Sequence, residues 1–233
     1  MNYFFCNNIQ HGEGALSPEE SLHCFKVLRK KEGDVIYILD GIGGEYEAEI
    51  DSISKRELTF KVINTKVHLA KGPNIHIVVA PTKNITRIEW LLEKATEVGV
   101  SAFTFIECDH SERKVIKLDR LNKIVQGATK QSGNYFLPVL NDIISFEYFL
   151  SKDIDGKVII GYCDGDRKKL KEAIEGVDDN YTIIIGPEGD FSVDEIEMVK
   201  AKGISLVTLG ETRLRTETAA LTALIQLKTL LDA

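Results

Sequence analysis

The sequence has few of the residues that build disulfide-bonded or metal-dependent folds. It contains 4 cysteines in 233 residues, namely Cys6, Cys24, Cys108 and Cys163. They are too dispersed to form a Cys-x-x-Cys pair, and no histidine stands beside them at metal-ligand spacing. We therefore expect reduced, partly buried cysteines and no metal site.

Long apolar segments are also absent. No stretch approaches the roughly 18 consecutive apolar residues that a membrane span requires. Residues Met1 to Asn8 form neither the basic n-region nor the apolar h-region of a signal peptide. These observations predict a cytoplasmic protein that makes no contact with a membrane.

Positive charge is in short supply over the chain as a whole. Lys and Arg number 29 against 36 Asp and Glu, and the net charge of −7 argues against a protein that coats nucleic acid without specificity. Basic residues nevertheless gather locally, from Lys26 to Lys31 and from His110 to Gln131. Such clusters are usually solvated helix faces, but they are compatible with a local RNA contact.

Residues 1 to about 70 have the pattern of a small β-barrel or sandwich. The predicted strands are Val35–Leu39, Glu45–Ile50 and Leu58–Val67. The turn Gly41–Gly44 joins the first two, and because no helix follows it, we read it as a hairpin and not as a dinucleotide-binding loop. One helix is expected over Pro18–Leu28, with Ser17 as its N-cap.

The stretch Lys71–Asn74 marks a domain boundary, so we predict one domain over residues 1–71 and another over 72–233. The second domain alternates strands and helices. This pattern indicates a mostly parallel α/β sheet covered on both faces. The predicted strands are Ile75–Ala80, Ala102–Cys108, Val158–Cys163, Tyr181–Ile185 and Ile204–Leu209, and the helices are Arg87–Val98, Leu118–Gln131, one that begins after Ser192, and Glu217–Leu231.

Two glycine-containing loops follow predicted strands of the second domain. One is Gly186–Gly189 and the other is Leu209–Ala219. Ligands of α/β sheets collect at the carboxyl ends of the strands, so we expect these loops to share a pocket. The P-loop lysine is missing and Glu188 would repel a phosphate, which favours a neutral or cationic ligand.

Read together, the motifs resemble those of the SPOUT superfamily of knotted methyltransferases, and in particular the family that methylates N3 of a uridine in small-subunit ribosomal RNA. The resemblance covers the full length. The segments that carry it are His23–Arg29 with Gly33-Asp34, Lys94–Val100, Ser111–Arg113, Ala128–Ser132, Ile185–Gly189 and Leu214–Ala219.

This resemblance implies an N-terminal PUA-like β-barrel that helps to hold RNA and a C-terminal SPOUT α/β domain with a trefoil knot. It also implies S-adenosylmethionine as cofactor, 16S ribosomal RNA or the small ribosomal subunit as substrate, and a homodimer. The residues that it assigns to the cofactor are Tyr162, Ile185, Gly186, Pro187, Glu188, Gly189, Leu209, Gly210, Leu214, Arg215, Thr216, Thr218 and Ala219.

The sequence departs from the family pattern in the cofactor loops. Asp190 stands where the family usually has a further glycine after Gly-Pro-Glu-Gly. In the second loop, Arg213 is displaced by one position from the family's first arginine. Neither departure removes the core of its motif.

Methyl transfer to uridine N3 requires the removal of a proton or stabilisation of the resulting anion. We expect Arg215 to stabilise charge on the uracil carbonyl oxygens, and Glu217 either to position Arg215 or to accept the proton. A glutamate in the first turn of a helix is also favourable without any catalytic role. For phosphate contacts with RNA we expect Arg29 and Lys30 in the barrel, and Arg113 and Lys114 in the second domain.

Two alternatives from other classes remain at this point. An inert RNA-binding protein would keep the basic clusters but bind no S-adenosylmethionine. A metabolic enzyme that uses the α/β pocket for a nucleotide would need a phosphate-binding lysine or a ribose-binding acid at known spacing, and the sequence has neither.

Overall fold

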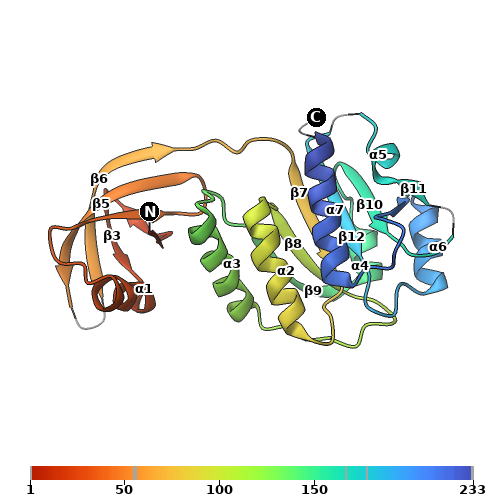
Figure 1. Ribbon diagram of the computed structural model, residues 1–233, viewed down its shortest axis with the longest axis horizontal. Coiled ribbons are helices and arrows are strands. Elements are labelled where there is room, and N and C mark those ends of the chain that lie inside the picture. The colour runs from red at the N-terminus through yellow and green to blue at the C-terminus, as the bar shows by residue number, and fades with distance from the viewer. Residues whose placement is uncertain (1, 55–56, 166, 177, 232–233) are drawn as a thin grey trace. The chain divides into compact units, whose positions relative to one another are not determined.

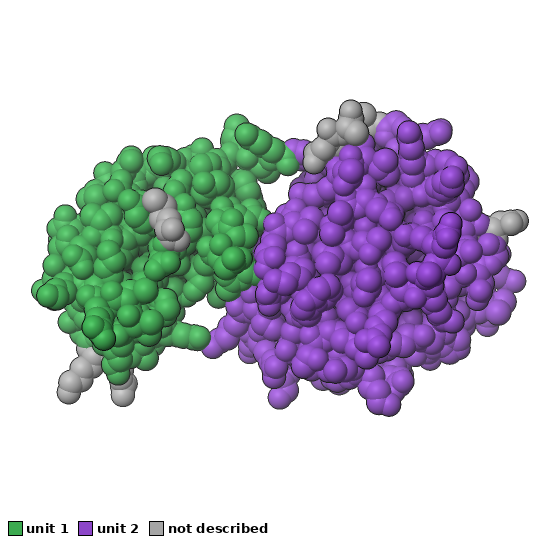
Figure 2. Space-filling model, viewed as in Figure 1, with its two compact units in different colours: residues 1–71, 126–137 green, residues 72–125, 138–233 purple. Residues whose placement is uncertain are grey.

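The computed structural model describes residues 2–54, 57–165, 167–176 and 178–231. The chain divides into two compact units, which are coloured separately in Figure 2. The first unit comprises residues 1–71 and 126–137, and the second comprises residues 72–125 and 138–233. Helix α3, Leu118–Ser132, spans the point at which the chain passes from the second unit to the first.

The first unit is built on a six-stranded sheet with the order β1-β4-β5-β6-β3-β2. Its pairs are antiparallel except for β1 and β4, which are parallel. The strands are β1 (Tyr3–Phe5), β2 (Ile9–Gln10), β3 (Glu13–Leu16), β4 (Val35–Leu39), β5 (Gly44–Ile53) and β6 (Leu58–Val67). The predicted β-rich character and the hairpin between β4 and β5 are confirmed. Alternate residues of these strands, including Phe4, Ile36, Ile38 and Phe60, form the core of the unit.

The predicted helix of the first unit begins where expected and then changes type. Ser17 caps α1 (Pro18–Leu22), and its Oγ accepts a hydrogen bond of 3.2 Å from the backbone N–H of Glu20. The segment continues as a π-helix, η1 (His23–Val27). The carboxylate of Glu20 forms an ion pair with Lys130 of α3.

Residues 126–137 join the first unit through polar and aromatic contacts that the sequence did not reveal. The His68 ring stacks on Tyr135, with 3.4 Å between the ring centroids and 4° between the planes. His68 Nε2 lies 2.9 Å from Glu45 Oε2, and the Tyr3 hydroxyl donates a 3.0 Å hydrogen bond to Glu45 Oε1. Burial, with Glu45 beside it, raises the pKa of Tyr3 to about 12. These contacts fix the segment after α3 against the sheet.

The second unit is a parallel sheet of seven strands in the order β11-β13-β10-β12-β7-β8-β9 (Figure 1). The strands are β7 (Asn74–Val79), β8 (Ala102–Glu107), β9 (Val139–Ser145), β10 (Lys157–Gly161), β11 (Lys168–Lys169), β12 (Asn180–Ile185) and β13 (Ser205–Thr208). The predicted alternation of strands and helices is confirmed. Strand β9 was not predicted, because Asn141 and Asp142 interrupt its apolar pattern and it pairs with β8 through a register shift.

Helices cover both faces of this sheet. On one face, α2 (Ile85–Val98) and α7 (Thr216–Leu231) pack side by side, and α7 crosses β12 and β7 (Figure 1). On the other face, α4 (Phe146–Ser151) and α6 (Val193–Ala201) pack on apolar side chains of the sheet such as Val78 and Ile184. Helix α5 (Leu170–Ala173) is short.

The helix termini follow the signals in the sequence. Ser192 and Glu195 form the predicted capping box of α6, and Gly99 ends α2 in a left-handed conformation with φ 90°. Among the described helices, we find none long and apolar enough to cross a membrane.

Candidate active site

A cavity of about 500 Å³ opens at the carboxyl ends of three neighbouring strands of the second unit. Strand β10 lies between β13 and β12, so the loops that follow these strands meet. The cavity is lined by residues 161–164 and Arg167 at and after the end of β10, and by residues of 185–190 at and after the end of β12. Residues of 208–219, from the end of β13 to the first turn of α7, complete the lining. Its volume is in the range of small-molecule sites, and its position is the usual one in an open α/β sheet.

Most of the residues predicted to bind the cofactor line this cavity. Gly189, Thr218 and Glu217 are the predicted site residues of these loops that do not. Gly189 instead packs on His110, whose Nδ1 lies 3.1 Å from the Gly189 carbonyl oxygen. Those that line the cavity are Tyr162, Ile185, Gly186, Pro187, Glu188, Leu209, Gly210, Leu214, Arg215, Thr216 and Ala219.

Sequence reasoning missed several lining residues. Gly161, Asp164 and Arg167 end or follow β10, beside the strand end at Tyr162 and Cys163 that the family resemblance placed at the cofactor. In the sequence, the sign of this part of the site is a predicted strand that ends near a glycine. The order of the strands in the sheet is needed to place β10 between the two strands that lead into the glycine loops. Glu211, Thr212 and Arg213 belong to the predicted loop Leu209–Ala219 but were not assigned individually to the cofactor, and Asp190 and Thr208 just outside the predicted loops also line the cavity.

Two glycines in the cavity wall are closely packed against neighbouring side chains. A Cβ on Gly161 would lie 2.7 Å from Ile185 Cδ1, and a Cβ on Gly186 would lie 2.7 Å from Cε2 of Phe191. The Phe191 ring leaves no room for a Cβ on Gly186, whereas a Cβ on Gly161 would require the end of the Ile185 side chain to shift. The wall is therefore formed largely by backbone at these points, which lets a ligand approach the N–H and C=O groups.

Asp190 resolves the departure at the end of the first loop. Its φ is 62°, so it adopts the left-handed conformation that glycine favours and that aspartate tolerates better than most residues. Its Oδ1 accepts a hydrogen bond of 2.9 Å from the N–H of Phe191. Its Oδ2 is buried without a hydrogen bond from the described residues and lies 3.9 Å from Nη2 of Arg213. Asp190 thus adopts a left-handed backbone conformation that is also open to a glycine at this position.

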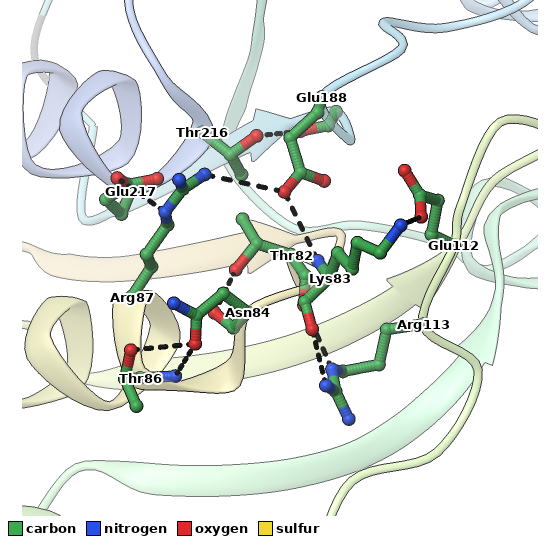
Figure 3. A network of polar contacts seen from close by, with 11 residues as sticks. Thr82, Lys83, Asn84, Thr86, Arg87, Glu112, Arg113, Glu188, Thr216 and Glu217 are labelled. Carbon is green, nitrogen blue, oxygen red and sulfur yellow. Dashed lines mark hydrogen bonds and ion pairs between the residues drawn. The ribbon is translucent and has the colours of Figure 1, made fainter.

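The two cavity loops are tied to each other and to the segment before α2. The Thr216 hydroxyl donates a 3.0 Å hydrogen bond to the carbonyl oxygen of Gly186. Glu188 Oε1 accepts a 3.2 Å hydrogen bond from the N–H of Lys83 and lies 3.7 Å from Nη1 of Arg87 (Figure 3).

The two predicted catalytic residues are placed differently. Arg215 is exposed and lines the cavity. Glu217 is 7% exposed, and its Oε1 lies 3.8 Å from Nε of Arg87. The ion-pair partner that the structure gives Glu217 is therefore Arg87 and not Arg215.

The four residues predicted to bind RNA differ in how they are engaged. Arg29 is exposed, with a φ of 55°. Lys30 Nζ donates a 3.0 Å hydrogen bond to the carbonyl oxygen of Val35. Arg113 donates from Nε to the carbonyl oxygen of Thr82 at 2.9 Å, and Lys114 Nζ lies 2.6 Å from Glu107 Oε1.

The charges of the cavity suit a ligand that carries positive charge. Carboxylates of Asp164, Glu188, Asp190 and Glu211 line it, and its size accommodates a nucleoside with an amino acid attached. The residues present therefore fit a sulfonium cofactor of this kind. The same lining contains three arginines, which could bind an anionic group beside the cofactor. They are Arg167, Arg213 and Arg215.

Comparison with known families decides what this site belongs to. Residues 70–228 match the family described as the RNA methyltransferase domain, and residues 16–63 match the RNA methyltransferase PUA domain. The chain belongs to this RNA methyltransferase family. The family and the enzyme class predicted from the sequence are confirmed.

Relatives in several bacteria are similar over almost the whole chain. The protein named ribosomal RNA small subunit methyltransferase E of Bacillus subtilis is 29% identical, and the alignment covers 90% of this chain and 87% of that protein. The crystal structure of a probable rRNA-methyltransferase from Porphyromonas gingivalis has a TM-score of 0.92 at 34% identity, covering 100% of this chain and 99% of that one.

A third similar protein was solved with a ligand. The structure of a ribosomal RNA small subunit methyltransferase E from Neisseria gonorrhoeae bound to S-adenosyl methionine has a TM-score of 0.85 at 26% identity, covering 99% of this chain and 98% of that one. The predicted fold class, a SPOUT α/β trefoil-knot domain after a PUA-like β-barrel, is confirmed by these matches.

Proposed function

We propose that this RNA methyltransferase transfers the methyl group of S-adenosylmethionine to N3 of a uridine in 16S ribosomal RNA. The observation that carries the proposal is the cavity at the ends of β13, β10 and β12, because the loops that match the family motifs line it together. Relatives named as small-subunit rRNA methyltransferases support the substrate, and a similar enzyme solved with S-adenosyl methionine supports the cofactor.

The cofactor would be held mainly by backbone groups. We assign it to the lining of the cavity from Ile185 to Glu188 and from Leu209 to Ala219, with Tyr162 at the end of β10. Gly189 and Thr218 do not line the cavity, so they would act by fixing the conformation of the loops that do. The carboxylate of Glu188 suits hydrogen-bond donors or positive charge on the ligand.

Bound S-adenosylmethionine supplies an electrophilic methyl group on a sulfonium. The chain itself has to align uridine with that group and to stabilise N3 as its proton leaves. Arg215 is the arginine we assign to the uracil carbonyl oxygens, where it would offset the developing negative charge. Glu217 points to Arg87 and so acts, in this proposal, on the position of the loop and not as the base.

RNA would be held by basic side chains of each unit. Arg29 is an exposed arginine of the first unit, and Lys30 follows it in the sequence. In the second unit, Arg113 and Lys114 make contacts within the protein, so they would reach phosphates only with their remaining donors. Because phosphate contacts release counterions, affinity for RNA should fall as salt rises. An affinity unchanged between low and high salt would contradict this part of the proposal.

We also propose that the enzyme is a homodimer that works in the cytoplasm on ribosomal RNA. Trp90 of α2 is 43% exposed and Ile225 of α7 is 45% exposed, although α2 and α7 pack together and α7 is apolar over most of its surface. A second copy of the chain would cover this face. Light scattering should give twice the mass of the chain, and Ile225→Glu should reduce it to one chain. Val193→Glu, at an exposed apolar residue of α6, is the control.

The decisive experiment combines cofactor binding with product analysis. Calorimetry should show S-adenosylmethionine binding, and incubation with 16S RNA or small subunits should yield 3-methyluridine in nucleoside mass spectra. Arg215→Ala should lose turnover with RNA even when S-adenosylmethionine is saturating. Binding without any methylated nucleoside would favour the inert RNA-binding alternative, and no binding of the cofactor would refute the assignment of the cavity.

A further inference from the structure

Arg87, in the first turn of α2, stands between the two loops that line the cavity. Its Nη1 lies 3.7 Å from Oε1 of Glu188, which belongs to the loop after β12. Its Nε lies 3.8 Å from Oε1 of Glu217, which lies in the first turn of α7, after the second loop. Figure 3 shows the guanidinium between the two carboxylates. Arg87 itself does not line the cavity.

The pair with Glu217 is the more demanding of the two. The side chain of Glu217 is 9% exposed, and its Oε2 is buried without a hydrogen-bond partner in the described part of the chain. A buried carboxylate is unfavourable unless a charge or donor compensates it. The start of α7 contributes a helix dipole, and Arg87 supplies the nearby positive charge. Without Arg87, the first turn of α7 would lose the group that holds this carboxylate in place.

The segment that leads into α2, just before Arg87, is held in place by several hydrogen bonds. Asn84 caps α2, and its Oδ1 accepts a 3.1 Å hydrogen bond from the N–H of Thr86. The Thr82 hydroxyl donates to the carbonyl oxygen of Asn84 at 2.8 Å, and Arg113 Nε donates to the carbonyl oxygen of Thr82 at 2.9 Å. The segment before α2 is therefore a fixed support from which Arg87 reaches both loops (Figure 3).

We infer that Arg87 is a positioning residue of the methyltransferase, which holds both cavity loops in the arrangement that the reaction requires. Through Glu188 it fixes the carboxylate in the cavity wall, and through Glu217 it fixes the turn that carries Thr216 and Arg215. It touches neither cofactor nor RNA in this inference. The inference rests on the proposed function for its catalytic consequence, but its effect on the loops is independent of the substrate.

The test compares Arg87→Met, Arg87→Lys, Glu217→Gln and the double variant Arg87→Met/Glu217→Gln. For each variant, calorimetry gives the Kd of S-adenosylmethionine, methyl transfer gives kcat and KM for RNA, and thermal unfolding gives Tm. The control is Arg120→Met, which removes another arginine of this unit. Nε of Arg120 lies 2.7 Å from Oε1 of Glu89, and neither residue belongs to the cavity loops.

We expect Arg87→Met to lower kcat by about 10- to 100-fold, because a small misplacement of reacting groups has effects of this size. The KM for RNA should change little, and the Kd for the cofactor should rise about tenfold. Arg87→Lys should retain part of the wild-type kcat and part of the wild-type affinity for the cofactor. The double variant should be no worse than Arg87→Met alone, because the uncompensated carboxylate is then absent.

The outcomes separate the inference from the proposed function. If wild-type enzyme methylates no RNA, the proposed function fails, while the cofactor Kd still tests Arg87. Arg87→Met with wild-type Kd and kcat would overturn the inference, as would effects of the two single variants that simply add. If Arg87→Met does not fold, Arg87→Lys and Glu217→Gln decide in its place. A loss of Tm with unchanged Kd and kcat, as expected for Arg120→Met, would make the role of Arg87 merely structural and refute the inference.

Discussion

The hydroxyl of Thr216 donates a hydrogen bond of 3.0 Å to the backbone carbonyl of Gly186. These residues are 30 positions apart in the sequence and belong to the two loops that meet at the cavity. Thr216 is 5% exposed, so water has little access to the bond. This hydrogen bond joins the two loops of the chain where they meet in the wall of the cavity.

Replacing Thr216 by valine removes this bond without changing the shape of the side chain. The Gly186 carbonyl is then left without its partner, which costs about 1–3 kcal/mol for a buried group. We expect a lower free energy of unfolding in urea and weaker binding of S-adenosylmethionine by calorimetry. Thr229→Val, which removes a 2.8 Å bond from an exposed threonine of the same helix to Ile225, should change neither. Equal effects of both variants would contradict the prediction.

Gly186→Ala should destabilise the cavity wall by crowding. The added Cβ would lie 2.7 Å from the ring of Phe191, which packs against Phe146 at 5.1 Å between centroids. Overpacking of a core costs about 1–3 kcal/mol. Gly210→Ala is the control for stability alone, since its Cβ would meet nothing within 4 Å. A Gly186→Ala protein as stable in urea as the control would show that the ring moves freely.

Asp190 offers a test of the left-handed turn. With φ at 62°, alanine at this position would be strained and would also lose the hydrogen bond to the N–H of Phe191. Asp190→Ala should therefore lower the free energy of unfolding by about 1–2 kcal/mol. Asp190→Asn keeps the acceptor and tolerates the conformation, so we expect near wild-type stability. Denaturant unfolding of the two variants side by side would decide, and equal losses would argue against backbone strain.

His76 of β7 links stability to pH. Its Nε2 lies 2.8 Å from the Thr104 hydroxyl, and burial lowers the pKa of His76 from 6.5 to about 4. The folded protein therefore binds this proton less readily than the unfolded chain does. Between pH 6.5 and about pH 4, the free energy of unfolding should fall as the pH falls, by at most about 3 kcal/mol from this residue.

Other groups titrate in the same range, so the comparison is with His76→Asn. The stability of the variant should depend less on pH over this window, while the difference between the two proteins should be constant above pH 7. Urea unfolding at half-unit steps of pH gives both curves. Parallel curves for the two proteins over the whole range would contradict a lowered pKa at His76.

Much of the local structure could be predicted from short-range patterns. Strands β4 and β6 have the predicted bounds, and the capping box of Ser192 starts α6 as expected. Such signals act within a few residues, so the sequence contains them completely. Strand β9 could not be found in this way, because its pairing with β8 compensates for the polar residues within it.

The two loops of the site could be predicted from the sequence, but the residues from other elements that pack beside them could not. The family resemblance located most of the lining after β12 and β13 and the strand end at Tyr162, but Gly161, Asp164 and Arg167 enter because β10 lies between those strands. The partner of Glu217 was missed for a similar reason. Arg87 lies 130 positions earlier in the sequence, and no local pattern relates the two residues.

The sequence by itself determined the secondary structure around the site, the glycine-containing loops and the family to which they belong. Backbone preferences, helix caps and apolar periodicity all act locally, which is why these features could be read without coordinates. Only the tertiary structure decided the order of β13, β10 and β12, the grouping of residues 126–137 with the first unit, and the contact of Arg87 with both cavity loops. These depend on which distant surfaces pack together, and burial and charge compensation select them only when the whole domain is folded.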